Sequence, residues 1–306
     1  MLDINEQLLC IQKMDFFHQL SPITLDKDIL YAVIKGDVLS VQSYGKLNAR
    51  RYSDIDILTT RDDLAVVEQR LRENGFSNNS KRTDRIALLA SSHQISPWGK
   101  NVSPWGRLEV DLNFDIFWGE YEGNRIDIKE FLSDTVEMDI YGVKVRTLSP
   151  IKAMIQLVLH HYKDMNSIFL LATRNSITYD MFKDVYYLLM NNLDAISLDR
   201  LYVMGEEYGV IPYLFYVLYY TGQIFDDKIL KQYIESFRTS EGESLLNYYG
   251  LCAKERKEWR CSFKTRLETK SIYNLIKDDL TEKDHCKISI NKRIFAEENP
   301  YEGNNY

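Results

Sequence analysis

Hydrophobic and polar residues follow two different patterns along the 306-residue chain, and the pattern changes near residue 149. Before that point, short apolar runs and alternation of apolar with polar residues predict β-strands, whose successive side chains point to opposite faces. After it, apolar residues recur at helical spacing, and Ser149-Pro150 has the residue types that begin a helix. We therefore predict an α+β fold: a mixed-sheet domain with helices at 1–149, an all-helical domain at 150–298 and a disordered polar tail at 299–306.

The same patterns predict individual elements. The helices expected after the boundary span 150–164, 179–192, 198–208, 211–222, 227–237 and 243–258. Before it, the pattern predicts an amphipathic helix over 1–20 that ends at Ser21-Pro22, a helix from Asp62 or Asp63 to Asn74, a strand over Arg85–Ala90 and a hairpin over Glu137–Leu148.

A short repeat precedes the most regular strand pattern. Ser96-Pro97-Trp98-Gly99 recurs as Ser103-Pro104-Trp105-Gly106, and the two copies flank residues 100–102. Proline and glycine at this spacing predict a loop that protrudes between strands. The favoured interpretation is that both tryptophans fold back onto the sheet; the alternative is a flap that stacks on a base or substrate ring.

Two carboxylates interrupt an apolar run at Asp54 and Asp56. In a strand, these two residues share one face, and Ile55 and Ile57 share the other. Two adjacent carboxylates repel each other, and burying them unpaired is costly. A divalent cation removes that conflict, and Mg²⁺ is commonly held by one or two carboxylates together with substrate phosphates. The alternative is a solvated edge strand with two exposed acids.

Segments on both sides of the aspartate pair favour the metal interpretation. Upstream, an apolar run from Leu30 leads into Lys35-Gly36 and then a helical pattern, where a glycine lets backbone amides approach a phosphate. Downstream, the strand 108–116 alternates strictly. Its polar face carries Glu109, Asp111, Asn113 and Asp115. This face offers a third carboxylate, for which Asp111 lies centrally and Glu109 is the alternative.

At these residues the sequence resembles the polymerase-β-like nucleotidyltransferase superfamily, and within it a bacterial branch with Lys-Gly where better-known members have Gly-Ser. The matching segments are Ile34-Lys35-Gly36, Arg51-Tyr52-Ser53-Asp54-Ile55-Asp56-Ile57 and Val110-Asp111-Leu112-Asn113. The chain departs from the pattern in three ways: no serine follows Gly36, the gap from Gly36 to Asp54 is longer, and Asn113 replaces the histidine usual in the branch.

The resemblance implies the superfamily's sheet, a nucleoside triphosphate substrate, with ATP the expected one, and Mg²⁺ or Mn²⁺ as cofactor. It implies that Asp54, Asp56 and Asp111 are catalytic and bind the metal. It also implies that Lys35, Gly36 and Arg51 contact the nucleotide, and that the helical domain contributes to a cleft for nucleotide and acceptor. The reaction would move a nucleoside monophosphate to a hydroxyl of a small molecule or protein and release pyrophosphate.

Composition and net charge argue against several classes of binding partner. The formal net charge of −7 argues against long nucleic acid as a substrate, since such binders usually present a basic surface. Four scattered cysteines without a Cys-x-x-Cys pair predict reduced thiols and no zinc site. The start of the chain lacks a signal-peptide pattern, and the most apolar run, 210–220, is shorter than the ~20 residues of a membrane span. We therefore expect a cytoplasmic protein with no membrane partner.

Two other functions fit the same aspartates. One is a non-catalytic nucleotide-binding or regulatory protein that keeps the fold. The other is a metal-dependent glycosyltransferase, because these enzymes also use Asp-x-Asp. Elsewhere, His160 and His161 are adjacent on a predicted helix, so their side chains diverge by about 100° and are not expected to form a zinc pair.

Overall fold

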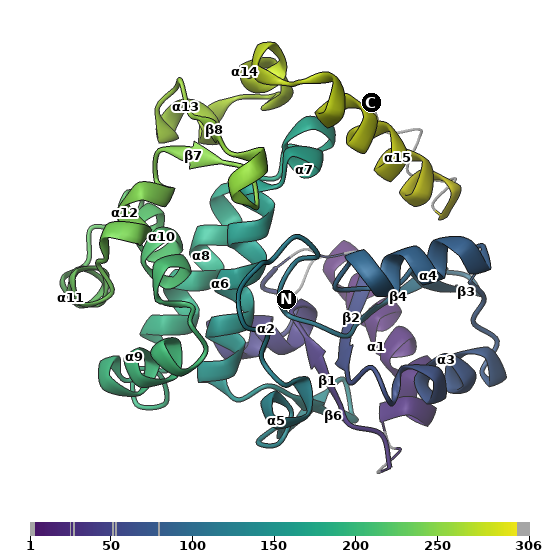
Figure 1. The fold of residues 1–306 in the computed structure, drawn as a ribbon. Helices are drawn as coiled ribbons and strands as arrows, with labels where there is room; N and C mark the ends of the chain where they lie inside the picture. Colours follow the sequence, from purple (N-terminus) through teal and green to yellow (C-terminus); the bar gives the residue numbers. More distant parts are fainter. Residues whose placement is uncertain are drawn as a thin grey trace. The chain divides into compact units, whose positions relative to one another are not determined.

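The computed structural model describes residues 4–24, 26, 28–50, 52, 54–78 and 80–298 (Figure 1). It contains two compact units. Unit 1 comprises Met1–Asp115 and Ile126–Ala153, and unit 2 comprises Ile116–Arg125 and Met154–Tyr306. The predicted tail at 299–306 lies outside the described residues.

A six-stranded mixed sheet forms the centre of unit 1, which confirms the predicted fold class. The strand order is β3-β4-β2-β1-β6-β5. Strand β2 runs parallel to β4 and β1 runs parallel to β6, and the other neighbouring pairs are antiparallel. The strands are β1 (Tyr31–Ile34), β2 (Asp54–Thr59), β3 (Trp98–Val102), β4 (Gly106–Asn113), β5 (Val136–Ile140) and β6 (Val143–Thr147). Strands β5 and β6 are the predicted hairpin.

Helices α1 (Ile4–Thr24) and α3 (Leu64–Glu73) pack on one face of this sheet (Figure 1). The core there combines side chains of both helices with the apolar face of β2 and β4. It includes Phe17, Leu20, Val67, Leu71, Ile55, Ile57, Val110 and Leu112. Because strand side chains alternate, the aspartates of β2 and β4 must lie on the opposite face. Three further helices of unit 1 are α2 (Gly36–Tyr44), α4 (Arg82–Ser91) and α5 (Ile128–Phe131).

Two predictions in unit 1 are wrong at the level of single elements. Residues Arg85–Ala90 form part of helix α4 and not a strand. The prediction failed because a short apolar run is compatible with either structure. Helix α1 continues through Pro22 to Thr24. Proline removes the amide that would donate to the carbonyl of His18, and the Ser21 hydroxyl donates to that carbonyl instead, at 2.8 Å.

The tryptophan repeat is built into the sheet. Residues 100–102 belong to β3, which pairs with β4, so the predicted protruding loop is wrong. Trp98 is buried in the core, and the indole Nε1 of Trp105 donates to Asp15 Oδ2 at 3.1 Å. Both tryptophans therefore contact unit 1 itself, as the favoured interpretation expected.

Unit 2 is built around α10 (Ile211–Gly222), whose central residues 214–218 are fully buried. Helices α8, α9, α11 and α12 contact it. Besides α10, the helices between residues 150 and 245 are α6 (Pro150–Asn166), α7 (Ile168–Thr173), α8 (Tyr179–Met190), α9 (Leu198–Glu207), α11 (Lys228–Ser236) and α12 (Ser240–Leu245). Five of the predicted helices, from 150–164 to 227–237, are thus confirmed within two residues at each end.

The predicted helix at 243–258 is wrong. This segment contains the end of α12, a small two-stranded sheet of β7 (Tyr248–Tyr249) and β8 (Lys257–Glu258), and the 3₁₀ helix η1 (Ala253–Glu255). Gly250, at φ +106°, lies directly after β7 and allows the turn. The chain then forms α13 (Phe263–Glu268), α14 (Tyr273–Ile276), the 3₁₀ helix η2 (Lys277–Asp279) and α15 (Glu282–Glu298).

No disulfide joins the four cysteines, all of which lie in the described part of the chain. Among the helices described, none combines the length and the apolar character needed to cross a bilayer.

Candidate active site

The sheet register places the predicted acidic residues side by side. In the parallel pair of β2 and β4, Asp56 lies opposite Asp111 and Asp54 lies opposite Glu109. One carboxylate oxygen from each of Asp54, Asp56 and Asp111 lies within 4.8 Å of the others. We call these three residues the carboxylate triad.

Glu109 has a different partner. Its Oε1 accepts a hydrogen bond from Nε of Arg107, two residues earlier on β4, at 3.2 Å. Of the two candidates for a third carboxylate, Asp111 therefore joins the aspartate pair, and Glu109 is held in an ion pair at the same edge of the sheet.

The triad is electrostatically unfavourable without a cation. Burial, together with the neighbouring carboxylates, raises the pKa of Asp111 well above its usual range. Burial and the charge of Asp54 also raise the pKa of Asp56, although Lys35 and Asn113 act in the opposite direction. The site therefore favours any positive charge that can approach these oxygens.

Lys35 supplies one such charge. Its Nζ lies 2.6 Å from Oδ1 of Asp56. The lysine directly follows Ile34, the residue that pairs with Asp56 across β1 and β2. It stands at φ +57°, and Gly36 after it at φ +45°, so both residues of this Lys-Gly turn have left-handed backbone. The turn leads straight into α2, which begins at Gly36.

Asn113 also contacts the triad. Its Nδ2 donates to Oδ1 of Asp56 at 3.3 Å. The asparagine that replaces the usual histidine of the branch thus interacts with the second carboxylate of the β2 pair. Arg51, the third predicted nucleotide contact, lies outside the described residues.

Sequence reasoning missed Asp37, the residue after the Lys-Gly turn. Its carboxylate is fully buried and accepts hydrogen bonds from the hydroxyl groups of Tyr52 and Tyr141 and from the amide of Asn48. The ammonium of Lys13 lies 3.6 Å from it. The available signal was an acidic residue directly after a glycine and directly before the mostly apolar stretch 38–41.

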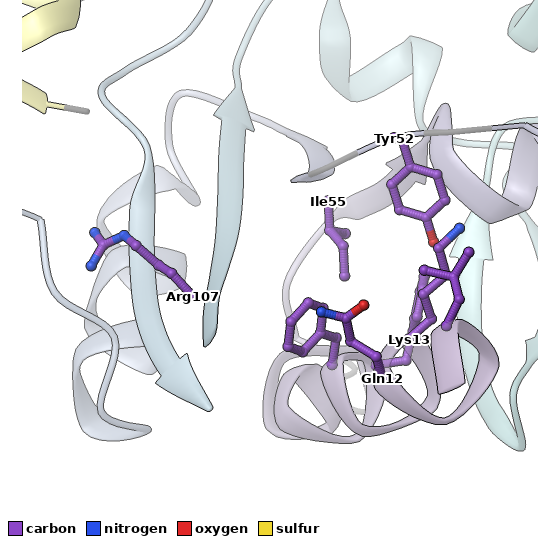
Figure 2. A pocket seen from close by; sticks show the side chains of 8 residues that line it. Gln12, Lys13, Tyr52, Ile55 and Arg107 are labelled. Carbon is purple, nitrogen blue, oxygen red and sulfur yellow. The ribbon is translucent and has the colours of Figure 1, made fainter. Parts of the chain in front are cut away.

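A cavity of about 210 Å³ lies beside this network, on the Ile55 side of β2. Figure 2 shows Gln12 and Lys13 rising from α1 toward Tyr52 and Ile55. Burial lowers the pKa of Lys13, and the nearby Asp37 offsets only part of that effect. Because Ile55 and the aspartates point to opposite faces of β2, the cavity is separate from the triad.

A second cluster of possible metal ligands lies on α6 in unit 2. Ligand atoms of His160, His161 and Asp164 lie within 4.8 Å of one another, so the expectation that the two histidines diverge from any common site is wrong. Nε2 of His160 is 3.2 Å from Asp164. The ammonium of Lys163 also lies 3.6 Å from Asp164 and 3.4 Å from Nδ1 of His160. A positive charge thus already accompanies this cluster.

Comparison with known proteins gives one family match. A family model described as "uncharacterised nucleotidyltransferase" matches residues 18–226. No curated protein matches the chain. Among solved structures, the chain is similar to the lincosamide antibiotic adenylyltransferase LnuA with bound lincomycin, at 15% identity and a TM-score of 0.32, covering 64% of this chain and 99% of that one. It is also similar to an antigenic nucleotidyltransferase-like protein from Paracoccidioides brasiliensis, at 16% identity and a TM-score of 0.31, covering 61% and 91%.

Proposed function

The chain belongs to the uncharacterised nucleotidyltransferase family, whose model spans residues 18–226 of 306, and we propose that it transfers a nucleoside monophosphate from a nucleoside triphosphate to a hydroxyl group. Family membership confirms the superfamily resemblance and the general class of nucleotidyl transfer. It also removes the glycosyltransferase alternative, which rested on Asp-x-Asp alone. The finer proposal names ATP as the donor and a small molecule or a protein side chain as the acceptor.

The observation that carries the proposal is the convergence of Asp54, Asp56 and Asp111 from two neighbouring strands. Hard oxygen donors that converge at one edge of a sheet fit Mg²⁺ or Mn²⁺, because these ions bind carboxylates. The raised carboxyl pKa values support this fit, since they show a group whose charge is unfavourable until a cation approaches. We propose that all three residues would hold the metal.

The residues of the site have different roles in the proposed reaction. Bound divalent ions would stabilise the charge on the attacking and leaving oxygens. Asp54 and Asp56 orient the triphosphate, and Lys35 and Gly36 face it from the start of α2. Arg51 is proposed as a further contact. Asp111 accepts the proton of the acceptor hydroxyl as its oxygen bonds to the α-phosphorus. The bond from that phosphorus to the bridging oxygen breaks, and pyrophosphate leaves.

Incubation with each α-labelled nucleoside triphosphate and Mg²⁺, first alone and then with cell extract, tests the proposal. The expected result is release of pyrophosphate and transfer of label to protein or to a small molecule, with ATP the best donor. The parent protein is compared with Asp56→Asn, which keeps the side-chain shape but removes one charge of the triad.

Label transfer that is equal in the parent and in Asp56→Asn would place the chemistry elsewhere. Tight triphosphate binding with no transfer to any fraction of the extract would instead favour the non-catalytic alternative on the same fold. The proposed partners are the nucleoside triphosphate and the acceptor, without long nucleic acid or a membrane. The proposed location is the cytoplasm.

A further inference from the structure

The ammonium of Lys35 lies where the triad needs a cation. It is 2.6 Å from Oδ1 of Asp56, and the two side chains are only 16% and 7% exposed. At that distance the ammonium and the carboxylate form an ion pair, and the charge of the lysine offsets part of the negative charge of the three neighbouring carboxylates.

The backbone of Lys35 supports this role independently. Its φ of +57° and ψ of −141° lie outside the regions that residues other than glycine usually adopt. Such a conformation costs on the order of 1–3 kcal/mol and persists only where surrounding contacts favour it. The short ion pair with Asp56 is a contact of that kind, because the ammonium reaches the triad from this turn.

Resting on the proposed function, we propose that Lys35 is the resident counter-ion of the carboxylate triad: its ammonium holds Asp56 when no divalent cation is bound and leaves when one binds. The lysine and the metal compete for the same oxygen, since a cation coordinated by Asp56 would repel an ammonium at 2.6 Å. The apparent metal affinity is then the intrinsic affinity multiplied by the fraction of molecules in which the lysine has left the triad.

Titration with Mn²⁺ in the absence of nucleotide, with free Mn²⁺ followed by electron paramagnetic resonance, tests this competition. Lys35→Met is expected to bind Mn²⁺ about tenfold more tightly than the parent, as for a lysine that occupies the site in about nine of ten molecules. Lys35→Arg, which keeps the charge, should bind close to the parent. Metal-free Lys35→Met should also unfold at a lower temperature, and Mn²⁺ should raise that temperature more than in the parent.

Equal or weaker Mn²⁺ binding by Lys35→Met would overturn the proposal, and would be the result for a lysine that contacts only the triphosphate. If Lys35→Met does not fold, the same comparison is made in an Asp111→Asn background, where one like charge has been removed. Asp56→Asn separates the two proposals. If it binds Mn²⁺ as the parent does, the triad is not the metal site and the proposed function fails as well; if it loses binding, only the role of Lys35 is in question.

Discussion

Asp111 and Glu109 differ in what each carboxylate contacts, and this difference predicts different kinetic effects. Asp111 lies with the β2 aspartates, whereas Glu109 pairs with Arg107. We expect Asp111→Asn to abolish turnover, because loss of a general base alone typically costs about 10²–10⁴-fold in rate. Binding of the Mg²⁺-triphosphate should be largely kept. Glu109→Gln should be milder, and Asp54→Asn and Asp56→Asn should lose both turnover and binding.

Single-turnover rates and triphosphate titrations check this ordering. Near-normal turnover in Asp111→Asn with loss in Glu109→Gln would reverse the assignment of the third carboxylate and keep the mechanism. Parent-like turnover in all four variants would remove the active site from this strand edge.

Gly36 offers a second prediction at the residue scale. At φ +45°, a Cβ would have space, 3.5 Å from the ring of Tyr52, but the left-handed backbone would be strained. Gly36→Ala should cost about 1 kcal/mol of unfolding free energy and also weaken triphosphate binding. Gly142→Ala is the matched control, because Gly142 is left-handed at φ +81° with open space around it, in the β5–β6 turn.

Thermal unfolding and nucleotide titration separate the two effects. Both variants should lose similar stability, and only Gly36→Ala should bind the triphosphate less tightly. Equal triphosphate affinity in the two variants would show that the Lys-Gly turn does not face the nucleotide.

The triad could be predicted from sequence because strand alternation places Asp54 with Asp56, and Asp111 with Glu109. The choice between Asp111 and Glu109 could not be derived from alternation, since it depends on the register of β2 against β4 and on Arg107. The contact of Lys35 with Asp56 depends on a left-handed residue that no propensity predicts. The burial of Asp37 depends on residues up to 104 positions away in the sequence.

At the scale of elements, the start of α15 carries a reciprocal cap. The amide and hydroxyl of Thr281 donate to Oδ2 of Asp284 at 2.8 and 2.7 Å, and the amide of Asp284 donates back to the Thr281 hydroxyl at 3.3 Å. Lys257 lies 2.9 Å from the same carboxylate oxygen. Burial acts to raise the pKa of Asp284, but the hydrogen bonds from Thr281 and the charge of Lys257 outweigh it and lower the pKa.

A carboxyl group whose pKa is lowered by folding stabilises the protein above its unfolded-state pKa, and the effect is lost as the pH falls through the folded-state value. Asp284→Asn should therefore lower the unfolding free energy by about 1 kcal/mol at pH 7, a shift of roughly 2–4 °C. The difference from the parent should shrink below about pH 4. Glu282→Gln, an exposed carboxylate in the same turn, is the control. A difference that is constant from pH 7 to pH 3 would contradict this account.

Elements with long, regular patterns were predicted well, and short or exceptional ones were not. Helices such as α8 and α10 have many apolar positions at helical spacing, so their period is clear. The ten residues of α4 bury only Leu88, which leaves little periodic signal. Pro22 within α1 looked like a stop because the compensating hydroxyl of Ser21 is a side-chain detail. The β7–β8 pair is two residues long on each side, below what alternation can reveal.

At the scale of the whole molecule, the segment Ile116–Arg125 belongs to unit 2 although both of its flanking segments belong to unit 1. Trp118 makes several of the contacts that join this segment to the rest of unit 2. The indole stacks obliquely on Tyr162 and meets Tyr213 edge-on, and its Nε1 donates to the carbonyl of Leu251 at 3.3 Å. A stretch of ten residues thus completes the aromatic core of a unit whose remaining residues begin only at Met154.

Trp118→Ala should destabilise unit 2 by about 3–5 kcal/mol, the usual range for a buried tryptophan. Hydrogen exchange followed by mass spectrometry should show faster exchange in α6 and α10. Trp98→Ala, a buried tryptophan of unit 1, is the matched control and should speed exchange in β3 and β4. Equal acceleration in both units after either change would show that they do not have separate cores.

Helix α1 has a consequence for where this protein can be shortened. The family match starts at residue 18, but the helix starts at Ile4. A chain trimmed to the matched residues would lose Lys13, whose ammonium lies over the Tyr52 ring and beside Asp37. It would also lose Phe16 and Phe17 from the core of unit 1. We therefore expect the smallest autonomous folding unit to be longer than the stretch that sequence similarity delimits, because residues 4–17 contact the segment that follows the Lys-Gly turn.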